Sequence, residues 1–221
     1  MEPHIPRTTV VMWWLPPLRS DIAASVEYTA VPSDIVPPRL EMMTSYLERA
    51  GLTAASGDLS YLDVGSCYGW FVSEMSKRGF DAKGIEMDKL ALELGPLVYG
   101  IDVAQVSVGD CITLLGDQAR TADVVSCFSV LHHFVMGRGT SSAPDLMARL
   151  AERTSKVLFL DTGQAHESWF RWTLPEWSPD YIASWILAHS DFTRVEAIGV
   201  DEDGSGVFRG KFGRTLFACT R

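Results

Sequence analysis

The chain has 221 residues and a mass of 24.4 kDa; 47% of the residues are apolar and 21% are charged. This length and composition fit one globular domain and exclude global disorder. The net charge of −9 disfavours a nucleic-acid partner, because an acidic protein as a whole repels the phosphate backbone.

The first 58 residues differ in character from the rest of the chain. The apolar run 10–18 is too short for a membrane span, and Pro16 and Pro17 interrupt it, so it does not resemble a signal peptide. We expect residues 1–58 to form an N-terminal lid or lead-in segment with one helix at 39–50, and residues 59–221 to form the main domain.

From residue 59 onward, short apolar runs alternate with longer amphipathic runs. This alternation is typical of repeated βα units around a mostly parallel sheet, so the sequence predicts an α/β fold. The expected strands are 59–64, 82–86, 104–108, 123–128 and 156–161. The expected helices are 69–78, 89–98, 111–118 and 144–154, with Asp88 and Asp110 as N-caps of the second and third. A helix at 179–189 follows, and strands 195–200 and 215–220, joined by a turn at 201–206, form an antiparallel hairpin.

The first strand of the main domain ends in a glycine turn that runs directly into a helix, Asp63-Val64-Gly65-Ser66-Cys67-Tyr68-Gly69. Gly65 permits a sharp turn and a close approach to a ligand, and Gly69 permits close contact at the start of the helix. The dinucleotide fingerprint would need glycine at Cys67 and at Trp70, so a nicotinamide cofactor fits poorly. Asp63 would repel a pyrophosphate, whereas it suits the ammonium and sulfonium groups of S-adenosylmethionine.

Two more acidic residues follow at strand ends. Glu86 lies about 20 residues after the glycine turn, where ribose hydroxyls are held, and Asp110 is placed to accept from an adenine amino group. Met87 and Phe128 are the expected apolar walls. A single acidic residue after a strand is often only a helix cap, but three acidic residues at successive strand ends favour an S-adenosylmethionine site. The residues expected to bind this cofactor are Asp63, Gly65, Ser66, Cys67, Tyr68, Gly69, Glu86, Met87, Gly109, Asp110, Cys111, Phe128 and Ser129.

These motifs resemble the class I S-adenosylmethionine-dependent methyltransferase superfamily, from about residue 59 to the C-terminus. Segment 63–69 is similar to its first motif, although Cys67 departs from the commonest Gly-x-Gly-x-Gly form. Segments 62–65, 84–86 and 129–134 are more narrowly similar to domains that terminate bacterial glycan chains and to sugar O-methyltransferases. The resemblance implies a Rossmann-like, seven-stranded, mostly parallel sheet with helices on both faces and an antiparallel last strand. It also implies methyl transfer to a sugar, a glycan or another small hydroxylated metabolite.

Three histidines are candidates for the base that a hydroxyl acceptor requires. His132 and His133 follow the fourth strand of the main domain, at the sheet edge where open α/β folds bind ligands, and we favour His133. Either one is about as often a helix cap or a packed polar residue. The aromatic segment 161–177 is expected to roof the acceptor pocket, and it contains the third candidate, His166.

No metal site is expected. His166 and Glu167 are adjacent in the chain, and adjacent side chains rarely converge on one ion with a third ligand such as Asp161. The cysteines form no Cys-x-x-Cys pair, which indicates a reducing, cytoplasmic location rather than a zinc site or a disulfide framework. These cysteines are Cys67, Cys111, Cys127 and Cys219.

Several alternatives remain open. The acceptor is alternatively an aromatic natural product or a phosphate, which needs no base, and a different class of protein is a non-catalytic, cofactor-binding partner subunit. Basic residues gather near the C-terminus, and we expect them to form a solvated strand face rather than an anion site. They are Arg209, Lys211, Arg214 and Arg221. The sequence does not specify the oligomeric state.

Overall fold

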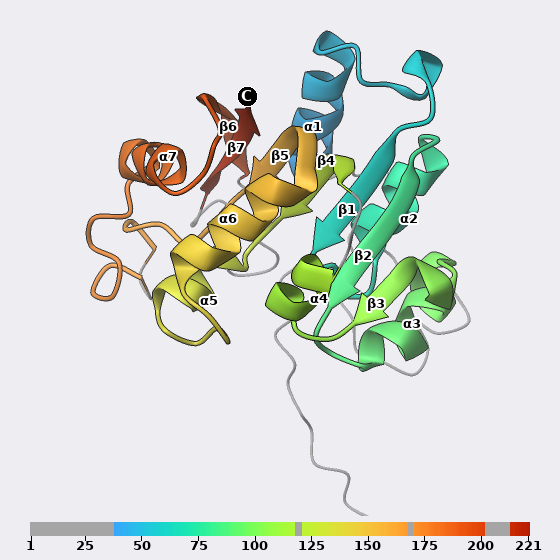
Figure 1. The fold of residues 1–221 in the computed structure, drawn as a ribbon, viewed down its shortest axis with the longest axis horizontal. Helices are drawn as coiled ribbons and strands as arrows, with labels where there is room; N and C mark the ends of the chain where they lie inside the picture. Colours follow the sequence, from blue (N-terminus) through green and yellow to red (C-terminus); the bar gives the residue numbers. More distant parts are fainter. Residues whose placement is uncertain (1–37, 118–120, 168–169, 202–212) are drawn as a thin grey trace, which may run out of the picture.

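A computed structural model describes residues 38–117, 121–167, 170–201 and 213–221. Seven strands form one sheet (Figure 1): β1 Ser60–Val64, β2 Asp81–Glu86, β3 Val106–Val108, β4 Ala122–Cys127, β5 Thr154–Leu160, β6 Arg194–Asp201 and β7 Arg214–Thr220. The helices are α1 Pro38–Arg49, α2 Trp70–Lys77, α3 Leu90–Tyr99, α4 Cys111–Asp117, α5 Leu131–Val135, α6 Ala143–Arg153 and α7 Pro179–Ala188, with short 3-10 helices η1 Ala54–Ser56 and η2 Val103–Gln105.

The strand order across the sheet is β3-β2-β1-β4-β5-β7-β6. Strands β1 to β5 are mutually parallel, and β7 runs antiparallel to both β5 and β6. The predicted α/β class and the antiparallel C-terminal hairpin are therefore confirmed. The order reverses between β1 and β4, and in open α/β sheets such a reversal leaves a ligand-binding crevice beyond the carboxyl ends of the strands.

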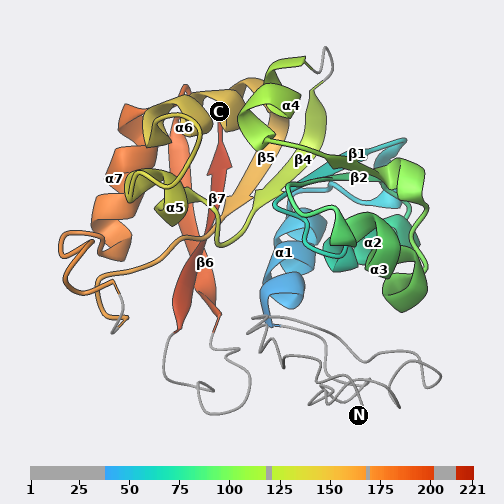
Figure 2. The same ribbon diagram turned by 90° about the horizontal axis from the view of Figure 1, so that it is seen from below.

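Helices cover both faces of this sheet (Figure 2), with α1 to α3 on one side and α4, α6 and α7 on the other. Successive residues of the central strands enter opposite cores: Val124 packs in the core beneath α1 to α3, and Val125 packs in the core beneath α4 to α7. Burial on both faces explains why these strands have continuous apolar sequences. Helix α1 lies within the predicted N-terminal segment and contributes Leu40 and Met43 to the first of these cores.

Most predicted elements are present, with ends displaced by one or two residues. The clearest error is the predicted strand 104–108, which begins only at Val106. Residues Val103–Gln105 form η2 instead, because the Asp102 carboxylate accepts from the backbone N–H of Ala104 and the Gln105 side chain accepts from that of Asp102. The short helix α5 was not predicted. Residue 118 of the predicted helix 111–118 and residues 202–206 of the predicted turn lie outside the described residues.

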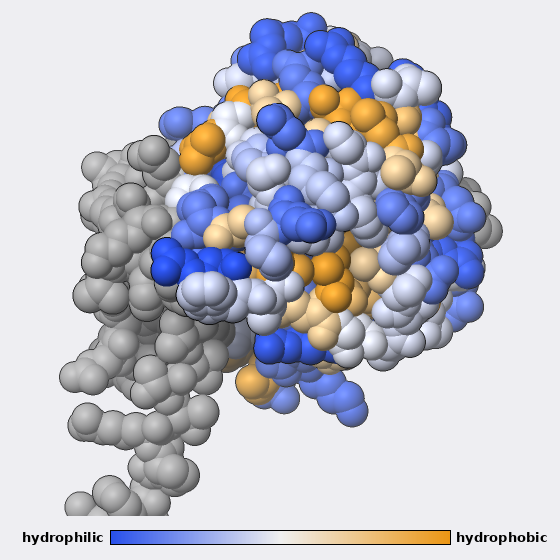
Figure 3. Space-filling view, turned by 90° about the vertical axis from the view of Figure 1, so that its left-hand side faces the viewer, coloured by the Kyte–Doolittle hydropathy of each residue, from blue (hydrophilic) through white to orange (hydrophobic). Residues whose placement is uncertain are grey.

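Both predicted capping residues accept hydrogen bonds near a helix start, but the N-cap residue of α3 is Lys89 rather than Asp88. The Asp110 carboxylate accepts from the backbone N–H of Thr113 at 3.0 Å, and that of Asp88 accepts from the N–H of Leu90 at 3.0 Å. The face that carries α7 has separate apolar areas with hydrophilic side chains between them (Figure 3). Within the described ranges, no helix combines the length and apolar character that a membrane crossing requires.

Candidate functional site

A cavity of about 610 Å³ lies at the carboxyl edge of the sheet, between the ends of β1, β2 and β4. All the predicted cofactor residues except Gly69 line it. Gly69 lies just outside with φ of 80°, and a β-carbon at this position would come within 2.5 Å of Ile101 Cδ1. Gly69 therefore allows α2 to start close to its neighbours rather than contacting the cavity itself.

The turn after β1 brings the backbone close to its surroundings. Gly65 has φ of 81°, and a β-carbon there would lie 2.5 Å from Val130 Cγ2. The backbone N–H groups of Gly65 and Ser66 both donate to the carbonyl of Ile85, at 2.9 and 3.0 Å. A larger residue at position 65 would therefore have to displace either this turn or Val130.

Glu86 is fixed at the end of β2 by backbone donors. Its Oε2 accepts from the N–H of Cys67 at 2.7 Å, and its Oε1 accepts from Met87 and Asp88 at 2.8 and 3.0 Å. Carboxylate–amide hydrogen bonds of this length are strong. They lock the ends of β1 and β2 together and set the orientation of the Glu86 carboxylate at the cavity wall.

Asp63 precedes the last residue of β1 and is nearly inaccessible, with 3% of its surface exposed. Ser126 Oγ donates to its Oδ1 at 2.6 Å, and the Tyr61 hydroxyl pairs with Ser126 at 2.5 Å. Burial raises the pKa of Asp63 to about 7; the Glu86 carboxylate adds to this rise, whereas the Ser126 hydrogen bond and the Arg39 cation oppose it. A cationic group in the cavity would favour the ionised form.

Asp110 and Phe128 complete the side of the cavity next to β3 and β4. The Asp110 carboxylate caps α4 and also accepts from Thr140 Oγ1 at 2.6 Å. Phe128 is 8% exposed, packs against Phe71 with ring centroids 5.0 Å apart, and has the Arg39 guanidinium 4.8 Å above its ring. Met87, the other predicted wall, is 74% exposed and lies at the rim.

Only one of the three candidate histidines lines the cavity. His133 is exposed there, whereas His166 is exposed elsewhere. His132 is buried against Phe170, and its Nδ1 accepts from the backbone N–H of Gly163 at 3.1 Å. Burial lowers the pKa of His132 to about 3, and the Arg214 cation adds to this effect, so His132 is a neutral packing residue at physiological pH.

The surroundings of His133 also favour its neutral form. Partial burial lowers its pKa from the usual 6.5, and the nearby Arg138 and Arg214 cations lower it further. The ring lies beside that of His132, with centroids 4.3 Å apart. A neutral imidazole facing a cavity has a free nitrogen lone pair and can accept a proton.

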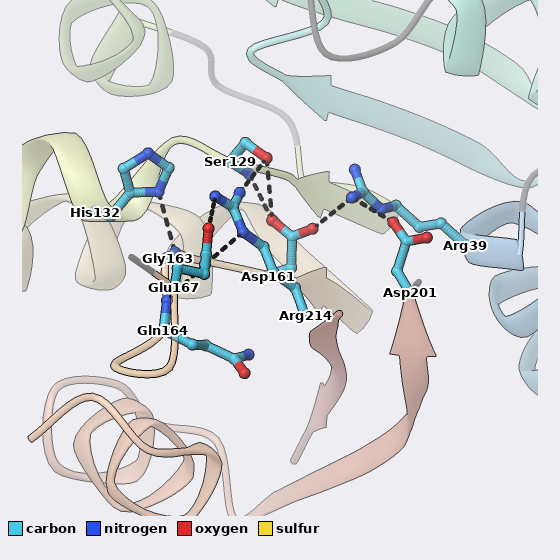
Figure 4. Close-up of polar contacts among 9 residues, drawn as sticks. All are labelled: Arg39, Ser129, His132, Asp161, Gly163, Gln164, Glu167, Asp201 and Arg214. Carbon is cyan, nitrogen blue, oxygen red and sulfur yellow. Dashed lines mark hydrogen bonds and ion pairs between the residues drawn. The ribbon is translucent and has the colours of Figure 1, made fainter. Parts of the chain in front are cut away.

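A polar network that the sequence analysis missed crosses the carboxyl edge of the sheet (Figure 4). One guanidinium nitrogen of Arg39 lies 2.8 Å from Asp161 and 2.5 Å from Asp201, and all three side chains are at most 12% exposed. Figure 4 shows Asp161 between Arg39 and Ser129, and its Oδ1 accepts from the Ser129 N–H at 2.6 Å. Ser129 has φ of 59°, a conformation rare for a serine, which these contacts stabilise.

Arg214 forms the other end of this network. Its guanidinium makes two hydrogen bonds to the buried Glu167 carboxylate, at 2.9 and 2.8 Å, and one to Ser129 Oγ at 2.8 Å. The prediction of a solvated basic face was therefore wrong for Arg214, because Glu167 draws it inward to the cavity wall. Arg221 pairs with Asp191, and Arg209 and Lys211 lie outside the described residues.

The prediction that the aromatic segment 161–177 roofs the acceptor pocket was also wrong for its described residues. Of the described part of segment 161–177, only Glu167 lines the cavity. Phe170 and Trp177 are buried in the core, where Trp177 packs against Trp185 of α7 at 5.6 Å, while Trp172 is 84% exposed. Trp177 thus packs this segment against α7. In the part of the chain that the structure describes, no group of three or more potential ligands could hold a metal ion.

Arg39→Leu is expected to destabilise the protein strongly. The substitution leaves Asp161 and Asp201 buried without their cation, and breaking a buried ion pair in this way costs about 3–5 kcal/mol of unfolding free energy. Thermal denaturation should show a melting temperature lower by about 6–20 °C. Arg49→Leu, at the exposed end of the same helix, is the control, and equal melting temperatures for the two variants would contradict this reading.

Comparison with known proteins finds a family model that matches part of the chain. A family model described as "Methyltransferase domain" matches residues 62–159, which run from β1 to β5. Residues 62–159 of the chain therefore correspond to a methyltransferase domain. S-adenosylmethionine is the cofactor that the resemblance to methyltransferases implies for this chain. Its cavity suits that molecule, because carboxylates at successive strand ends surround a narrow glycine turn.

One curated relative is a ubiquinone biosynthesis O-methyltransferase of Acinetobacter baumannii (strain ACICU), which is 35% identical to this methyltransferase over 92 residues. The match covers 39% of this chain and 36% of the relative.

Solved structures share the fold. The bifunctional kinase-methyltransferase WbdD superposes with a TM-score of 0.63 and 18% identity, over 82% of this chain and 39% of that one. Magnesium protoporphyrin IX methyltransferase from Synechocystis PCC 6803, solved with bound S-adenosylmethionine, superposes with a TM-score of 0.55 and 16% identity, over 83% and 79%. This methyltransferase spans little more than a third of the A. baumannii relative and of WbdD.

Proposed function

We propose that this methyltransferase methylates a hydroxyl group of a sugar, a glycan or another small hydroxylated metabolite, with His133 as the general base. The observation that carries the proposal is the position of His133, a neutral imidazole in the same cavity as Asp63, Glu86 and Asp110. Those acids define the cofactor end of the cavity, and His133 belongs to the acceptor end.

At the cofactor end, each acid has a separate proposed role. Asp63 faces the positively charged part of the cofactor, Glu86 accepts from the two ribose hydroxyls, and Asp110 accepts from the adenine amino group, with Phe128 against the adenine ring. Glu86 is oriented in advance by three backbone N–H groups, so it loses little freedom on binding. Bound S-adenosylmethionine supplies an activated methyl group.

At the acceptor end, the protein has to align the hydroxyl and remove its proton. His133 is held near the end of β4 by α5, and the buried His132 anchors that helix through its bond to Gly163. His133 can take the acceptor proton at neutral pH because its pKa lies below 6.5. The Arg214 guanidinium donates hydrogen bonds to Glu167 and Ser129, which hold its side chain in place at the cavity wall near His133.

The second candidate acceptor is an aromatic hydroxyl. The specific observation that favours it is the likeness to the A. baumannii ubiquinone biosynthesis O-methyltransferase. The cofactor end and the base would serve both acceptor classes equally, so the two candidates differ only in the acceptor itself.

The proposal is tested with the purified protein, S-adenosylmethionine and a panel of sugars, phosphosugars and phenols, using mass spectrometry of the products. We expect a mass gain of one methyl group on a hydroxyl oxygen of at least one panel member. Methylation on a phosphate oxygen, or methylation that His133→Ala leaves intact, would overturn the role of the base. Binding of S-adenosylmethionine without turnover of any acceptor would favour a non-catalytic subunit.

A further inference from the structure

The segment 137–140 after α5 connects the proposed base to the cofactor end of the cavity. The N–H groups of Gly137 and Arg138 donate to the carbonyls of Phe134 and His133, at 3.0 and 2.8 Å, which is the Schellman pattern of helix termination. Gly137 has φ of 70°, as this pattern requires. The position of Arg138 relative to His133 is thus set by backbone hydrogen bonds.

Two further contacts fix the rest of this segment. A β-carbon on Gly139 would clash with the Phe134 ring, so the backbone packs directly on that ring. Thr140 Oγ1 donates to Asp110 at 2.6 Å. The backbone that carries Arg138 is therefore held at both ends, before any ligand binds.

Arg138 differs from the other two arginines of the cavity. Arg39 and Arg214 are buried and paired with carboxylates. The guanidinium of Arg138 is exposed at the cavity wall, and among the described residues no hydrogen-bond acceptor or carboxylate contacts it. The Asp110 carboxylate, on the same side of the cavity, accepts from Thr113 and Thr140 and not from Arg138.

Among the described residues, no carboxylate compensates the charge of Arg138 at the acceptor end, although the whole protein has a net charge of −9. Glu167 neutralises Arg214, and partial burial together with the cations of Arg138 and Arg214 lowers the pKa of His133, which favours its neutral form. A free guanidinium presents a planar fork of donors that matches a carboxylate or a phosphate. A neutral acceptor would form no ion pair with the Arg138 guanidinium.

We infer that Arg138 binds an anionic group of the acceptor, a carboxylate or a phosphate, beside the hydroxyl that is methylated. Arg138 is then a specificity-determining residue, whereas His133 handles the proton. This inference rests on the proposed function for the identity of the acceptor end. It can be tested by binding alone, without turnover.

The test measures binding by calorimetry to the protein saturated with S-adenosylhomocysteine. Two matched pairs of probes are used: 3-hydroxybenzoate with 3-hydroxybenzamide, and glucose 6-phosphate with glucose. We expect one anionic probe to bind at least about 10-fold more tightly than its neutral partner, as is usual for a charge-assisted contact. The pair that shows the preference tells a carboxylate from a phosphate.

Arg138→Gln should abolish that preference, reducing the affinity for the anionic probe by about 10- to 100-fold and leaving the affinity for S-adenosylhomocysteine as in the wild type. Arg138→Lys should retain part of it, and Arg149→Gln, at an exposed arginine of α6, is the matched control. Equal binding of both members of each pair, or a preference that survives Arg138→Gln, would overturn the inference. Failure of the methylation assay alone would count against the proposed function and not against Arg138.

Discussion

Asp63→Asn is expected to weaken the binding of S-adenosylmethionine by about 30- to 5,000-fold at pH 8, because removing one partner of a desolvated charge pair typically costs about 2–5 kcal/mol. The substituted amide would keep the size of the side chain and a hydrogen-bond partner for Ser126, so the loss would report the missing charge. Isothermal calorimetry with S-adenosylmethionine measures it. Asp81→Asn, at the exposed opposite end of neighbouring β2, is the matched control.

The same substitution should stabilise the ligand-free protein at high pH. The folded-state pKa of Asp63, about 7, lies above the usual 3.8, so between these values the folded state binds more protons than the unfolded state. The unfolding free energy contributed by Asp63 therefore falls as pH rises through this window, and the ionised carboxylate costs stability above pH 7. Asp63→Asn should raise the melting temperature at pH 8 and change it far less at pH 4. A lower melting temperature at pH 8 would contradict this account.

The cofactor half of the cavity was predictable because its signals are local. The turn after β1 needs a glycine within a few residues of a strand end, and the acids at Glu86 and Asp110 follow strands whose apolar runs are visible in the sequence. The carboxyl ends of parallel strands lie at the same edge of a sheet, so the acids that follow these strands are expected to lie close together. Their contact with the cofactor stays a prediction, although all of them line one cavity.

Apart from His133, the residues of the acceptor half were not predictable, because their positions depend on pairings across long stretches of sequence. Glu167 and Arg214 meet only through the antiparallel pairing of β7 with β5, and Arg39 reaches Asp161 and Asp201 only because α1 packs beside β6. No sequence spacing encodes such contacts. The prediction of an aromatic roof failed for a similar reason, because the sequence does not show that Trp177 packs against α7 or that Phe170 packs against His132.

His133→Ala is expected to reduce kcat by about 100- to 10,000-fold on a hydroxyl acceptor, which is the usual contribution of a positioned general base. The affinity for S-adenosylhomocysteine should remain that of the wild type, because His133 lies at the acceptor end of the cavity. Single-turnover methylation followed by mass spectrometry measures the chemical step. His166→Ala is the matched control, since His166 is exposed and does not line the cavity, and it should retain wild-type turnover.

The pH dependence separates a base from a residue that only fills space. A base acts when it is unprotonated, so wild-type kcat should be constant near neutral pH and fall as pH decreases through the pKa of His133. That pKa lies below 6.5, because burial and the cations of Arg138 and Arg214 all disfavour the imidazolium. Arg138→Gln removes one of these cations and should move the acid limb toward higher pH. An acid limb that persists in His133→Ala, or that does not respond to Arg138→Gln, would show that another group takes the proton.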